Sequence, residues 1–144
     1  MNDFQTCVAP VLSGQIRRRG GAIVSCMDSA CHLVGGTGGR FTLSPTDMAA
    51  NFQAVKAQVN LASGNPNDSL LLIEPTEDDV LPSAAAGSHG GGELFPTVST
   101  NPAVNQCTAA ISRWISIKVT DQADARCGIC ATVTPVTNTM TCGY

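Results

Sequence analysis

Residues 26–32 of this chain, Cys-Met-Asp-Ser-Ala-Cys-His, place a histidine directly after the second of two cysteines. Covalent attachment of haem needs two thiols that reach the vinyl groups of one porphyrin, and an imidazole that meets the iron from one face. Four residues separate the cysteines, where the common motif has two, so the intervening segment must bulge. Two alternatives remain open: a local disulfide, or a zinc site that combines Cys26, Cys31 and His32 with His89 or a C-terminal cysteine.

The second histidine of the chain, His89, is followed by three glycines. Because glycine has no Cβ, such a loop can approach a flat ligand closely. His89 is therefore the candidate for a second axial ligand opposite His32, although a solvated loop histidine is the plain alternative. Met27, Met48 and Met140 are the rival ligands for this position.

Composition limits the class of protein further. A chain of 144 residues fits one domain. Its net charge of −3 gives no basic face for nucleic acid. No stretch approaches the roughly 20 apolar residues that span a bilayer. Aromatic residues make up only 4%, and a bound porphyrin would supply the missing apolar bulk.

Seven cysteines in so short a chain indicate an oxidising compartment. The first residues contain no apolar signal segment, so we expect the sequence to be a mature chain whose export signal has been removed. The expected location is extracytoplasmic, either periplasmic or extracellular. If haem uses two cysteines, five remain, and an odd number implies a free thiol or a bond to another chain.

The chain is expected to be mostly α-helical. Its 14 glycines and charged fraction of 13% predict a loop-rich domain with short helices, which hydrophobic periodicity helps to locate. We expect Pro10 to kink the first helix, and Ser44 to be the N-cap of the second with Pro45 in its first turn. The short segment 70–73 is expected to be fully buried. Beyond residue 120 the chain is rich in Thr, Val and Cys, which predicts an extended, disulfide-tied tail. The expected helical segments are 3–12, 44–59, 70–73 and a last helix that Pro102 opens.

Five motifs occur in an order that resembles small bacterial class I-like cytochrome c domains of the planctomycete type. The resemblance extends roughly from Phe4 to Lys118. It departs from the family in the two extra residues of the haem motif and in a long connector before Cys26. The motifs are Phe4 with Val8-x-Pro10-Val11-Leu12, Gly39-Arg-Phe-Thr-Leu43, the turn Gly64-Asn-Pro-Asn-Asp-Ser-Leu-Leu71, His89-Gly90-Gly91, and Trp114-Ile115.

The resemblance implies a small class I-like cytochrome c fold of short helices around one covalent haem, over residues 1–120, with residues 121–144 as a C-terminal extension. It implies haem binding by Cys26, Cys31, His32 and His89, with the two histidines on the iron. Because the terminal helices cross in this fold, it also implies a Cys7–Cys107 disulfide. One bridge within the tail, involving Cys142, is expected as well, with a redox-active Cys127-x-x-Cys130 as a sharper alternative.

Two imidazoles would saturate the iron, which predicts an electron carrier and not an enzyme. The expected partners are redox proteins, other cytochrome subunits or copies of the chain itself. Alternatives are a haem enzyme or gas sensor with an open sixth position, and a zinc- or disulfide-stapled binding module. The candidates for the apolar wall around the haem are Phe41, Phe52, Leu70–Ile73 and Trp114.

Overall fold

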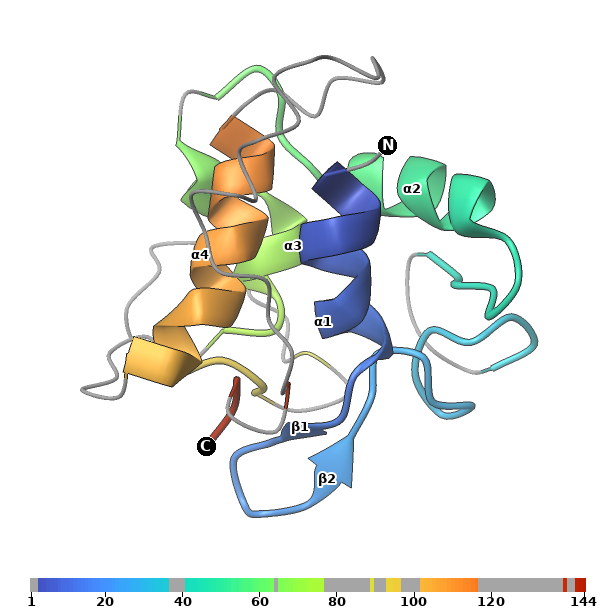
Figure 1. Cartoon of the computed structure of the whole chain (residues 1–144), viewed down its shortest axis with the longest axis vertical. Helices are drawn as coiled ribbons and strands as arrows, with labels where there is room; N and C mark the ends of the chain where they lie inside the picture. The colour runs from blue at the N-terminus through green and yellow to red at the C-terminus, as the bar shows by residue number, and fades with distance from the viewer. Residues whose placement is uncertain are drawn as a thin grey trace.

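The computed structural model describes residues 3–36, 41–63, 65–76, 89, 93–96, 102–116, 139 and 142–144, without the side chains of residues 102–106. Over these residues the chain is a small, partly helical domain with few strands. The N-terminal helix lies between α4 (Pro102–Ser116) and α2 (Met48–Lys56), and a two-stranded hairpin lies at one end of the molecule (Figure 1). The predicted boundary between residues 120 and 121 falls outside the described residues.

The N-terminal helix changes its hydrogen-bond register in front of a proline. Residues Phe4–Val8 form a π-helix, η1, in which the Ala9 N–H donates to the Phe4 carbonyl, and α1 (Ala9–Ser13) follows without a break. Pro10 has no N–H to donate, and its ring crowds the carbonyl four residues earlier, so a regular α-helical hydrogen bond is lost at this point. The predicted helix is therefore present, with the irregularity located before Pro10.

Helix α2 begins later than the sequence pattern predicts. Asp47 is its N-cap and accepts a hydrogen bond from the Ala50 N–H at 2.9 Å. Ser44 stays outside the helix because the side chain of Asn51 bonds both its N–H, at 2.6 Å, and its carbonyl, at 2.7 Å. The Ser44 hydroxyl instead closes a separate turn by accepting from the Asp47 N–H. The prediction of Ser44 as the N-cap is wrong, and the helix ends at Lys56 instead of residue 59.

The short helix α3 (Leu70–Ile73) follows a single 3₁₀ turn, η2 (Pro66–Asp68). Leu71 and Leu72 are buried, whereas the other two residues of α3 are only half-buried, so the segment is less covered than predicted. The buried hydroxyl of Ser69 accepts from the Asn60 N–H at 3.1 Å and so ties α3 to the turn after α2. Helix α4 begins at Pro102, as predicted.

Three aromatic rings connect the helices at the centre of the core. The ring of Phe4, on η1, lies 5.5 Å from Phe52 on α2 and 5.5 Å from Trp114 on α4, measured between ring centroids. All three residues are almost fully buried. Phe4 thus joins the two longer helices, and the resemblance motif that contains it has a packing role.

The C-terminus returns to the hairpin formed by β1 (Ile16–Arg17) and β2 (Ile23–Val24). The Tyr144 N–H donates to the Arg17 carbonyl at 2.9 Å. A Cβ on Gly143 would lie 1.9 Å from that carbonyl oxygen, so the close approach requires glycine.

The disulfides differ from the predicted pairs. Cys107 on α4 bonds to Cys142, with 5.5 Å between the Cα atoms, and Cys7 takes part in a separate disulfide. The predicted Cys7–Cys107 bond is wrong because the C-terminal residues, folded back beside α4, bring Cys142 to Cys107. The predicted bridge within the tail is wrong for Cys142 for the same reason, and Cys127-x-x-Cys130 lies outside the described residues.

Across the part of the chain that is described, no helix combines the length and apolar character needed to cross a bilayer.

Candidate functional site

The loop of residues 26–32 closes on itself. The His32 N–H donates to the Cys26 carbonyl at 2.9 Å, and the Cys31 N–H donates to the Asp28 carbonyl at 2.8 Å. The Asp28 carboxylate accepts from the Ser25 N–H at 2.7 Å, which fixes the start of the loop. The four residues between the cysteines are thus accommodated in a compact bulge whose ends meet.

Both cysteines of this loop are free thiols. Desolvation raises the pKa of the Cys26 thiol to about 12, and the nearby Cys31 thiol adds to the effect. Burial also raises the pKa of Cys31, followed by the negative charge of Asp28. Near neutral pH both groups are therefore thiols and not thiolates, which makes them poor nucleophiles for disulfide exchange.

His32 is oriented by Phe41, which follows nine residues later in the chain. Its Nδ1 lies 3.0 Å from the Phe41 carbonyl oxygen, and the Phe41 ring stacks on the imidazole with 4.1 Å between centroids and 14° between planes. A carbonyl only accepts hydrogen bonds, so Nδ1 carries the proton and Nε2 keeps its lone pair. The backbone is fixed as well, because the Leu43 N–H donates to the His32 carbonyl at 2.5 Å. This arrangement leaves the Nε2 lone pair able to bind a metal ion.

His89 lies across from His32, with 6.1 Å between ring centroids and 25° between ring planes. A metal–imidazole bond is about 2 Å long and the ligating nitrogen lies about 1.2 Å from its ring centre, so two imidazoles on opposite sides of one metal have centroids roughly 6 Å apart. The observed distance between the two centroids is close to that value. The glycines after His89 lie outside the described residues.

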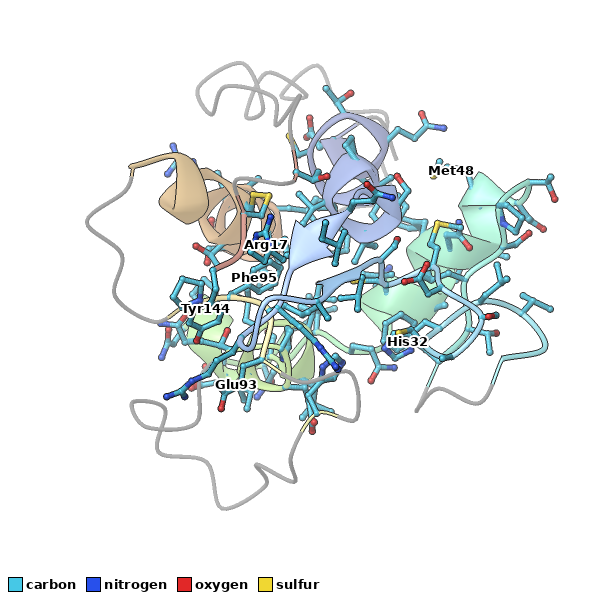
Figure 2. The ribbon with its side chains drawn as sticks, turned by 90° about the horizontal axis from the view of Figure 1, so that it is seen from below. Arg17, His32, Met48, Glu93, Phe95 and Tyr144 are labelled. Atoms are coloured by element: carbon cyan, nitrogen blue, oxygen red, sulfur yellow. A yellow bond between two sulfur atoms is a disulfide. The ribbon has the colours of Figure 1, made fainter. Side chains whose placement is uncertain are left out.

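The segment of residues 93–95, shortly after His89, is bonded to two other parts of the chain. Arg19 contacts Glu93 twice, through its N–H to the Glu93 carbonyl and through its guanidinium to the carboxylate, both at 2.9 Å. Leu94 and Phe95 both donate their N–H groups to the Pro75 carbonyl, at 2.8 and 2.9 Å. Figure 2 shows Glu93 and Phe95 on the segment near β1, with His32 on the loop that follows the hairpin. The segment is thus fixed between the hairpin turn and the end of α3.

A mostly apolar cavity of about 170 Å³ joins these groups. Both histidines and Cys26 line it, together with the predicted wall residues Phe41, Leu70 and Leu71. Cys31, Met27 and Met48 are not among the lining residues, and Met140 lies outside the described part of the chain. The remaining lining residues are Leu12, Gln58, Glu74, Pro75, Leu94, Phe95 and Ile111.

Part of the predicted wall belongs to the core instead. Phe52 and Trp114 face Phe4, and neither Leu72 nor Ile73 borders the cavity. Two lining residues that were not predicted, Leu94 and Phe95, could have been found from the sequence, since they are an apolar pair shortly after the glycines that follow His89. Glu74 and Gln58 could not have been found in this way, because only the tertiary fold brings them to the cavity.

No family model, curated protein sequence or solved structure matches the chain. Within the described ranges, no three His, Cys, Asp or Glu side chains gather in a way that could hold a metal ion. The chemistry of the site therefore has to be inferred from a histidine pair, two free thiols and an apolar cavity.

Proposed function

We propose that this chain is a class I-like c-type cytochrome that binds one haem covalently through Cys26 and Cys31 and transfers electrons. The observation that carries the proposal is the 6.1 Å spacing of His32 and His89 across an apolar cavity that Cys26 also lines. These three residues also belong to the Cys26–His32 motif and the glycine-flanked histidine of the sequence. Local sequence and three-dimensional placement thus support one ligand set.

The donor set suits an iron porphyrin. Cys26 and Cys31 are protonated thiols near neutral pH, and a thiol adds across a vinyl group to give a thioether. His32 would hold the iron through Nε2 as the proximal ligand, and His89 would hold it as the distal ligand. The apolar lining suits the faces of a porphyrin, and exclusion of water is one of the factors that set a haem's potential.

When bound, haem supplies the one-electron chemistry of its iron. The residues of the chain would keep that chemistry simple: the Nδ1–H of His32 donates to the Phe41 carbonyl oxygen, and His89 would hold the iron at the position that a gas or peroxide would need. With two imidazoles and no methionine, the potential should lie below that of a Met/His cytochrome. The proposed role is electron transfer, with no catalytic residue.

The alternatives have less support. A structural zinc site needs four converging ligands, and the described residues provide no group of three. A haem enzyme or gas sensor needs an open sixth position, which the placement of His89 opposite His32 disfavours. A disulfide-stapled module does not account for two free thiols in the loop of His32, or for the pairing of His32 with His89.

The setting that we propose is extracytoplasmic, either periplasmic or extracellular, because the Cys107–Cys142 and Cys7 disulfides persist under oxidising conditions. The proposed partners are redox proteins, other cytochrome subunits or further copies of the chain.

An absorption spectrum tests the proposal. We expect the protein, produced by export in a host that matures c-type cytochromes, to show the sharp reduced bands of a six-coordinate haem and no change with carbon monoxide. The matched control is Cys26→Ala/Cys31→Ala, which should lose the stably bound haem. A colourless parent protein would rule out the haem proposal, and a carbon monoxide-sensitive one would favour the enzyme or sensor.

A further inference from the structure

Phe41 makes two separable contacts with His32. Its carbonyl oxygen lies 3.0 Å from Nδ1, and its ring lies face to face with the imidazole, 4.1 Å away and inclined by only 14°. The first contact belongs to the backbone and survives any substitution of the side chain. The second depends on a flat ring at position 41.

The two contacts restrict different motions of the imidazole. A hydrogen bond to a carbonyl oxygen tolerates a broad range of directions, so it fixes the tautomer of His32 more strictly than the tilt of its ring. A stacked aromatic ring restricts the tilt, because turning the imidazole would force its edge into the Phe41 face. The ring of Phe41 is therefore the contact that determines the plane of His32.

The plane of the His32 ring determines its orientation relative to the ring of His89. His32 and His89 are inclined by 25°, so the two rings are closer to parallel than to perpendicular. We propose that Phe41 is a positioning residue that holds the His32 imidazole nearly parallel to that of His89 on the haem iron. This inference rests on the proposed function, and adds to it the residue that sets the relative orientation of the axial ligands.

The orientation of two axial imidazoles is visible in the electron paramagnetic resonance spectrum of low-spin ferric haem. Nearly parallel planes separate the energies of the two iron d orbitals that interact with the ligands, which gives a rhombic spectrum with three resolved g values. Nearly perpendicular planes leave those orbitals close in energy, which gives one highly anisotropic feature. The parent protein should show the rhombic type.

The test compares Phe41→Leu with Phe41→Tyr in the haem-containing protein. Leucine keeps the backbone carbonyl and the apolar bulk but removes the flat face, so the rhombic signal should broaden and shift toward the anisotropic type. Tyrosine keeps the flat face and should retain the parent g values. Phe52→Leu is the matched control, because Phe52 packs against Phe4 and Trp114, and its g values should equal those of the parent.

A second readout does not depend on the paramagnetic iron. Both the reduced low-spin protein and a haem-free protein are diamagnetic, so the ring protons of His32 can be followed by nuclear magnetic resonance in either. The ring current of Phe41 should shift them upfield in the parent and in Phe41→Tyr, and Phe41→Leu should lose that shift. Failure to bind haem would count against the proposed function alone. A non-rhombic parent spectrum, or unchanged g values in a haem-containing Phe41→Leu, would overturn the positioning role.

Discussion

At the scale of single residues, the chemistry of this chain is concentrated in a few side chains whose local setting matches their proposed task. His32 has its tautomer fixed by a carbonyl and its plane fixed by a ring. The sequence was sufficient to propose Cys26, Cys31 and His32 together, because these three residues are neighbours along the chain. It could not identify the part played by Phe41, since the stacking depends on the pairing of the segment after His32 with Leu43.

The role of His89 gives a prediction at this scale. His89→Ala should keep the covalent haem, because Cys26, Cys31 and His32 are unchanged, but it should open the sixth position. The ferric spectrum should become high-spin, and the reduced protein should bind carbon monoxide. Met48→Leu is a suitable control, since Met48 packs against the core and does not line the cavity, and its spectrum should match the parent. A low-spin His89→Ala protein that ignores carbon monoxide would show that another residue binds the iron.

At the scale of elements, local signals predicted where helices occur better than where they begin. The sequence pattern located α1 to α4 but not the 3₁₀ turn η2, and α2 starts at Met48 because Asn51 binds both backbone groups of Ser44. These two hydrogen bonds join residues that lie seven apart in the sequence, so a capping motif does not predict them. The disulfide partners were wrong for a related reason: the path of the C-terminal residues beside α4 and β1 is a tertiary feature with no local signal.

The bond between α4 and the C-terminal residues should contribute measurably to stability. Cys107 and Cys142 are 35 residues apart, and closing a loop of that length lowers the entropy of the unfolded chain. Relative to the parent, Cys107→Ala/Cys142→Ala should lose roughly 2–4 kcal/mol of unfolding free energy, measured by urea denaturation without reductant.

Peptide mapping of the unreduced parent provides the control for this prediction, and should recover one peptide pair that contains Cys107 and Cys142. Recovery of Cys107 bound to a different cysteine would contradict the pairing. An unchanged urea midpoint in the double variant would show that the bond adds nothing to stability.

At the scale of the whole molecule, the cavity is assembled from parts that are distant in the sequence. Leu12 comes from the N-terminal helix, Leu70 and Leu71 from α3, and Ile111 from α4, while His89 lies between α3 and α4 in the sequence. Any of these apolar residues would also suit an ordinary core, so hydrophobic pattern alone could not separate the cavity wall from the centre of the fold. Phe52 and Trp114 show the converse, because they were predicted at the wall and lie in the core.

The central claim is that this assembled site holds one haem by two thioether bonds, and the mass of the denatured protein tests it most directly. After acid–acetone extraction, the intact parent chain should retain the mass of the polypeptide plus one haem. The Cys26→Ala/Cys31→Ala chain should have the mass of the polypeptide alone. A parent chain that has passed through a cytochrome c maturation pathway and still shows only the polypeptide mass would contradict the account.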